Sequence, residues 1–224
     1  MKKILVWDLP TRLFHWLLAL SFLGAFLSAD SERHRDVHVA LGYTVLGLVA
    51  FRLVWGLIGT RYARFSAFPL SPRRAFAYLK SLASRAPQHH VGHNPAGSLA
   101  IYALLALALG AGASGYAAYN DIGGEALAEL HEAAANAMLG LVLVHIGAVI
   151  VSSFVHRENL VAAMLHGYKP GRSGEGISSK QRFVGALVLL ATLGFWAGSA
   201  GLLPQSLGNA VTAAAARAAG AKHG

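Results

Sequence analysis

Apolar residues of this chain gather into five long runs separated by shorter polar segments. The runs cover approximately residues 13–29, 37–59, 98–119, 128–155 and 183–203. Each is long enough for a helix to cross a hydrocarbon core of roughly 30 Å. The fourth run exceeds that length, so its helix is expected to tilt or to project beyond the bilayer. The pattern predicts an all-α, multi-pass membrane bundle with a four-helix unit at 1–170 and an additional helix with a tail at 171–224.

Composition supports a membrane protein and narrows its chemistry. The chain is 55% hydrophobic and 13% charged, against roughly 25% charged residues in soluble domains. The net charge of +9 would suit nucleic acid or anionic lipid. The basic residues lie between the apolar runs, however, which favours membrane topology, and we expect no nucleic-acid partner. The absence of cysteine excludes disulfides, thiolate-bound iron–sulfur clusters and c-type haem attachment.

The distribution of lysine and arginine predicts the orientation. With the N-terminus inside, inner segments hold fourteen of these residues and outer segments hold four. This bias predicts a cytoplasmic N-terminus in a bacterial inner membrane, with the first apolar run retained as a helix. The inner loop at 60–97 has six basic residues and no acidic ones. Within it, residues 72–79 suit an amphipathic helix on the anionic leaflet, and a solvated basic loop is the open alternative.

Four histidines fall inside the predicted spans: His15, His38, His131 and His145. Ionisable side chains in spanning helices are costly, usually face the bundle interior and mark function. His131 and His145 are fourteen residues apart, which at ~100° and ~1.5 Å per residue places them on nearly the same face about 21 Å apart. One helix therefore presents two imidazoles to the bundle at two depths.

Topology predicts a partner for each of these imidazoles. By depth alone, His15 pairs with His145 on the cytoplasmic side and His38 pairs with His131 on the periplasmic side. Two opposed imidazole pairs suit two six-coordinate haems, because haem provides four nitrogen ligands to its iron and the protein provides the other two. Zinc prefers four protein ligands, and only Glu132 adds a carboxylate here. For any single histidine, a hydrogen-bonded core residue is the alternative.

Two arginines are candidate partners for haem propionates. Arg12 lies one turn before His15, and Arg52 follows His38 by fourteen residues on nearly the same face. A buried guanidinium is best explained by a carboxylate partner, and snorkelling of Arg52 to the interface is the alternative. Small residues that would admit a flat macrocycle or another helix are Gly42, Gly47 and Gly140.

Several stretches over roughly residues 4–170 together resemble the bacterial cytochrome b561 and nickel–iron hydrogenase cytochrome b superfamily. They are Val6-Trp7-Asp8 with 12–16, 38–42 with Arg52, 92–95, 130–132 through His145, 156–160 and 164–167. The resemblance implies two b haems, held by His15 with His145 and by His38 with His131. It also implies electron transfer between a quinone or quinol pool and a hydrogenase, a dehydrogenase or a periplasmic c-type cytochrome.

Three alternatives stay open at this point. Arg33, His34 and Arg35 lie beside His38 and could guide an anion, as in a superoxide:quinone-type oxidoreductase. A metal transporter with a histidine-lined path would show discontinuous helices and inverted repeats. A structural anchor subunit would hold no cofactor. In the loop, His93 is either a quinone or propionate contact or a histidine in a polar turn.

Overall fold

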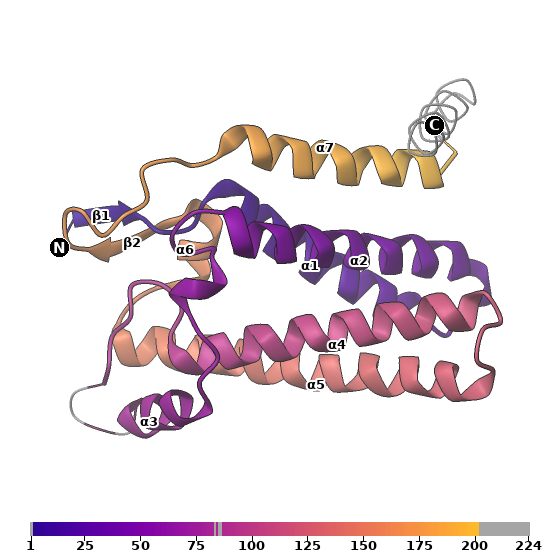
Figure 1. The fold of residues 1–224 in the computed structure, drawn as a ribbon, viewed down its shortest axis with the longest axis horizontal. Coiled ribbons are helices and arrows are strands. Elements are labelled where there is room, and N and C mark those ends of the chain that lie inside the picture. The colour runs from indigo at the N-terminus through magenta and orange to yellow at the C-terminus, as the bar shows by residue number, and fades with distance from the viewer. Residues whose placement is uncertain (1, 83, 85–86, 202–224) are drawn as a thin grey trace, which may run out of the picture.

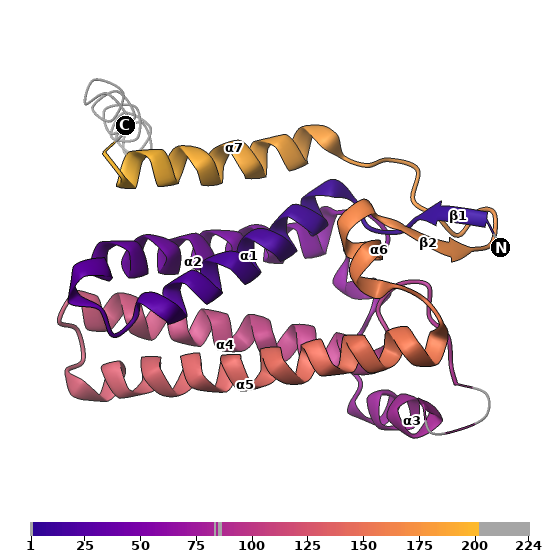
Figure 2. The same ribbon diagram turned by 180° about the vertical axis from the view of Figure 1, so that it is seen from behind.

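The computed structural model describes residues 2–82, 84 and 87–201. Five long apolar helices dominate these residues, and each is long enough to cross a membrane. They are α1 (Leu9–Ser28), α2 (Arg35–Ile58), α4 (Pro95–Tyr119), α5 (Glu125–His156) and α7 (Arg182–Ser199). Figures 1 and 2 show them running side by side. The predicted all-α membrane bundle is confirmed, while the tail from residue 202 lies outside the described residues.

Polar caps start α1 and α4, which begin four and three residues earlier than their apolar runs. Asp8 precedes α1, and its carboxylate accepts a hydrogen bond from the backbone N–H of Thr11 at 2.8 Å. Asn94 caps α4 in the same way through the N–H of Gly97 at 2.7 Å. A proline in the first turn of each helix lacks an N–H that would otherwise need a partner.

The core lies between α1, α2, α4 and α5, where Phe14, Val49 and Met138 are among the buried side chains. Helix α7 lies on the side of α1 and α2 that faces away from α5 (Figures 1 and 2). It is joined to α2 by a hydrogen bond from the indole Nε1 of Trp196 to the hydroxyl of Thr44 at 2.9 Å. The division of the chain at residue 170 stays a prediction.

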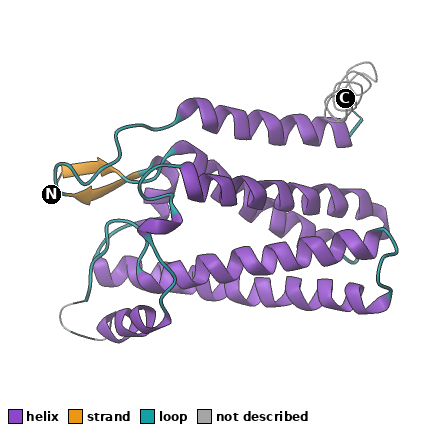
Figure 3. Cartoon of the chain, viewed as in Figure 1, coloured by secondary structure: helices purple, strands orange, loops and turns teal. Residues whose placement is uncertain are grey.

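One end of the bundle carries a layer of short elements. Strand β1 (Lys2–Leu5) pairs antiparallel with β2 (Tyr168–Gly171), as Figure 3 shows in orange. The layer also contains α3 (Pro72–Leu82), α6 (Leu160–His166) and the 3₁₀ turn Phe65–Ala67; a second such turn, Glu32–His34, leads into α2 at the other end. Helix α3 confirms the amphipathic helix predicted at 72–79. We call this end the basic end, because its described segments carry thirteen of the fourteen lysines and arginines of the predicted inner segments.

Candidate cofactor-binding site

The structure brings the four span histidines together in the predicted pairs. His15 on α1 faces His145 on α5 near the basic end, with ring centroids 6.5 Å apart. His38 on α2 faces His131 on α5 near the opposite end, with centroids 5.9 Å apart. Because an imidazole nitrogen binds a transition metal at roughly 2 Å, rings at these separations can share one metal atom between them.

Backbone carbonyls orient both rings of the outer pair. His38 Nδ1 lies 2.8 Å from the carbonyl oxygen of Ala25, and His131 Nδ1 lies 2.7 Å from that of Ala111. A carbonyl accepts but cannot donate, so each Nδ1 carries a proton, and in the neutral imidazole this leaves the lone pair on Nε2. This is the arrangement in which metal-binding histidines are usually held.

A cavity of about 420 Å³ adjoins the outer pair. Its volume is in the range of small-molecule and cofactor sites. His38 and His131 line it together with Gly42, Gly112 and Gly115. A Cβ at Gly42 would meet nothing within 4 Å, whereas a Cβ at Gly115 would lie 2.6 Å from Nδ1 of His131. The glycines therefore open space beside the imidazoles, which fits a bulky flat group.

The inner pair has a different environment. The Nδ1 atom of His15 is buried and has no hydrogen-bond partner within the described part of the chain. The His15 ring packs edge-on against Trp16, with centroids 5.0 Å apart. A buried ring nitrogen without a partner is unusual and calls for an explanation. The His15–His145 pair thus also fits a bound metal group, although no backbone carbonyl of the described residues is hydrogen-bonded to its rings.

Arg52 is buried among phenylalanine rings instead of reaching the surface. Its side chain is 2% exposed, and its guanidinium carbon lies 4.9 Å from the ring centre of Phe65 and 5.7 Å from that of Phe68. The negative charge of Asp8 attracts the guanidinium of Arg52. The Nη1 atom of Arg52 nevertheless has no hydrogen-bond partner among the described residues. The snorkelling alternative is therefore wrong, and Arg52 presents a free donor inside the basic end.

Arg12 lies at the same end, beside α6. One of its terminal nitrogens donates to the carbonyl of Leu165. Its Nε atom is buried and has no partner in the described ranges. Arg12 and Arg52 therefore each offer a guanidinium nitrogen without a described partner at the basic end, the end nearer the His15–His145 pair.

His93 is half-buried and packs between aromatic rings, which disfavours the polar-turn alternative. Its ring centroid lies 4.6 Å from that of Trp7 and 4.4 Å from that of Phe68. Burial, with a smaller effect of the positive charge of Arg52, lowers the pKa of His93 to about 3. The ring is therefore neutral at physiological pH.

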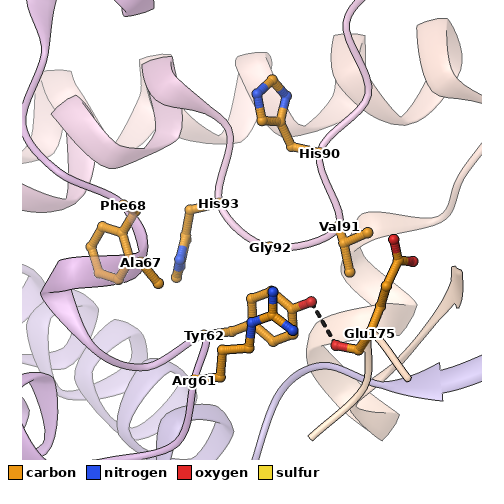
Figure 4. A pocket seen from close by; sticks show the side chains of 9 residues that line it. All are labelled: Arg61, Tyr62, Ala67, Phe68, His90, Val91, Gly92, His93 and Glu175. Carbon is orange, nitrogen blue, oxygen red and sulfur yellow. Dashed lines mark hydrogen bonds between the residues drawn. The ribbon is translucent and has the colours of Figure 1, made fainter. Parts of the chain in front are cut away.

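A second cavity lies beside His93. Its volume is about 240 Å³, and Tyr62 and Glu175 are among its lining residues (Figure 4). The Tyr62 hydroxyl donates to the backbone carbonyl of Glu175 at 2.7 Å, which ties the loop after α2 to the segment after β2. Sequence reasoning missed this cavity because its wall comes from three separate loops.

Comparisons with known proteins agree with the geometry. The family described as prokaryotic cytochrome b561 matches residues 6–167. A probable Ni/Fe-hydrogenase B-type cytochrome subunit of Azotobacter vinelandii is 24% identical over 213 residues, covering 74% of this chain and 88% of the relative. The corresponding protein of Azotobacter chroococcum mcd 1 is 27% identical over 146 residues, covering 53% and 60%. No solved structure matches the chain significantly.

Proposed function

We propose, from the premise that the chain belongs to the prokaryotic cytochrome b561 family, that it carries two b haems and conducts electrons through a bacterial inner membrane. Membership makes it a multi-pass membrane b-type cytochrome that acts in electron transfer. The observation that carries the finer proposal is the presence of two facing imidazole pairs, at opposite ends of α5. Each pair would supply the two axial ligands of one haem iron.

The protein's own groups prepare these ligands. In the outer pair, the carbonyls of Ala25 and Ala111 hold His38 and His131 with Nε2 available. In the inner pair, metal binding to the His15 ring at Nδ1 would explain why this nitrogen is buried and has no partner among the described residues. Haem held by these histidines would supply one-electron transfer.

Arg12 and Arg52 are proposed to bind haem propionates at the basic end. Each has a buried guanidinium nitrogen without a partner among the described residues. A charge-assisted hydrogen bond to a carboxylate would satisfy both the donor and the charge. The aromatic cage of Arg52 excludes water, so that such a bond would be stronger there than at the surface.

A quinone or quinol is the proposed electron partner in the membrane. The neutral His93, beside the 240 Å³ cavity at the basic end, is a candidate contact for its oxygen. The partner at a membrane surface is proposed to be a hydrogenase or another dehydrogenase, since the relatives are named as hydrogenase cytochrome subunits. A periplasmic c-type cytochrome is the alternative, with exposed Asp121 in the turn before α5 and exposed Glu125 and Glu129 on the first turns of α5 as its docking charges.

The two other activities have weaker support. The outer cavity is lined by Arg35, which would attract superoxide, but equally by Asp30 and Glu32, which would repel it. For a metal transporter, the span histidines form two separated pairs and no continuous path. Within the described ranges, no group of three or more His, Cys, Asp or Glu side chains could hold a metal ion.

The test is a visible spectrum of the purified protein before and after dithionite, with a pyridine haemochrome count. We expect a b-type spectrum with two haems per chain, and one haem in each of the variants His15→Ala and His131→Ala. A protein that remains colourless after reconstitution with haem would contradict the proposal. Two haems that persist in both variants would contradict the ligand assignment alone.

A further inference from the structure

We propose that α3 binds the headgroups of anionic phospholipids at the basic end of the bundle. This inference concerns a surface that electron transfer does not use. Its starting point is the position of α3, which lies beside the last turns of α5 in Figures 1 and 2. The partner follows from the depth, the exposed side chains and the charges of this helix.

The depth of α3 follows from its packing against α4 and from a side-chain contact with the last residue of α5. Tyr78 is 2% exposed, and its hydroxyl lies within hydrogen-bonding distance, 3.2 Å, of Nε2 of His156. His156 is the last residue of α5, which has 32 residues and is therefore about 48 Å long. Such a helix outreaches a hydrocarbon core of roughly 30 Å. Its end, and α3 with it, lies at the depth of the headgroups.

The exposed face of α3 is that of an interfacial helix. Ala75 and Tyr78 are buried against the bundle, whereas Phe76 is 73% and Leu79 52% exposed. Phe76 and Leu79 are three residues apart and so lie next to each other on the helix. Two large apolar side chains at headgroup depth, on a helix that also carries cations, are typical of helices that lie in the membrane surface.

The charges of α3 favour anionic lipid. Arg73, Arg74 and Lys80 are exposed, and neither of the ion pairs in the described part of the chain includes them. The whole loop at 60–97 contains no acidic residue, so these cations have no counter-charge nearby in sequence. Phosphate groups of anionic lipids would supply it.

The absence of cysteine from the chain allows single spin labels to test the proposal on the full protein. One label replaces Leu79 on the apolar face (Leu79→Cys), and a control label replaces the exposed Ala77 on the polar side (Ala77→Cys). Each protein is reconstituted into vesicles of phosphatidylcholine alone or with added phosphatidylglycerol. Accessibility to oxygen and to a water-soluble nickel chelate then reports on immersion.

We expect the label at 79 to lose its accessibility to nickel in the phosphatidylglycerol vesicles, and the label at 77 to keep it. Raising the salt concentration, or the triple change Arg73→Gln, Arg74→Gln and Lys80→Gln, should restore nickel access at 79. Equal nickel access at 79 in both kinds of vesicle would overturn the proposal. The comparison between the two kinds of vesicle uses proteins in which Arg73, Arg74 and Lys80 are unchanged. It therefore does not depend on the folding of the triple variant.

Discussion

At the scale of single residues, the outer imidazole pair depends on a missing side chain. Gly115 on α4 faces His131, and a Cβ there would lie 2.6 Å from Nδ1 and 2.8 Å from Cε1 of the ring. The same Nδ1 is bound to the carbonyl of Ala111 at 2.7 Å. A methyl group would have to displace the ring and break this hydrogen bond. Gly115 therefore shapes the position of a proposed haem ligand, His131, without being a ligand itself.

We therefore predict that Gly115→Ala removes the outer haem, because His131 can no longer face His38. The measurement is the haemochrome count, which should fall from two haems per chain to one. Gly110→Ala is the matched control, since it lies on the same helix and its Cβ would meet nothing within 4 Å. Both changes raise helix propensity by about 1 kcal/mol, so a difference between them reports on His131. A full haem count in Gly115→Ala would contradict this role.

At the scale of elements, one carboxylate joins two helices and a loop. Asp8 is 1% exposed and caps α1 through the N–H of Thr11. It also accepts hydrogen bonds from the indole of Trp55 on α2 at 3.1 Å and from the hydroxyl of Thr60 at 2.6 Å. The start of the first span is thereby fixed to the end of the second, and with it the height of His15.

We predict that Asp8→Ala lowers the free energy of unfolding by about 3 kcal/mol. The lost cap contributes about 1 kcal/mol. The indole of Trp55 and the hydroxyl of Thr60, left without their acceptor, contribute about 1 kcal/mol or more each. Asp8→Asn keeps an acceptor and should lose less. Denaturant unfolding in detergent measures the change. The control is Asn159→Ala, which removes only the cap of α6; equal losses in the two alanine variants would disprove the joining role of Asp8.

The sequence predicted the helices better than their connections, for a physical reason. Apolar runs report on contact with lipid, so they locate the spans. They do not report on caps, and α1 and α4 accordingly begin earlier, at the residues after Asp8 and Asn94. Strands β1 and β2 are four residues long and pair across more than 160 residues. No local pattern marks such a pairing.

The candidate site, like the fold, could be predicted from the sequence only in part. The pairing of the histidines follows from helix direction and depth, which the sequence contains. The carbonyl contacts of His38 and His131 depend on how α1 and α4 approach these rings, which spacing does not reveal. The burial of His93 likewise arises from Trp7 and Phe68, two residues that only the folded loops bring together.

At the scale of the whole molecule, the two imidazole pairs lie in different electrostatic surroundings. The inner pair is close to the basic end, where Arg52 is buried and Arg12 is half-buried. The outer pair lies beside a cavity whose lining includes the acidic residues Asp30 and Glu32 and the basic residue Arg35. A nearby positive charge stabilises the reduced form of a haem, which has gained an electron, and so raises its midpoint potential. We therefore expect the buried arginine to raise the potential of the inner haem more than that of the outer haem.

Arg52→Gln should therefore lower the midpoint potential of one haem and leave the other nearly unchanged. A unit charge at about 10 Å and an effective dielectric constant near 20 contributes about 1–2 kcal/mol, which corresponds to about 50–100 mV for one electron. Arg64→Gln is the control, because Arg64 is an exposed cation at the same end, where water and salt screen its charge. A spectroelectrochemical titration resolves the two components. Equal shifts in the two variants would show that Arg52 acts only through the general charge of the basic end, whereas a shift confined to Arg52→Gln places its guanidinium beside the inner haem.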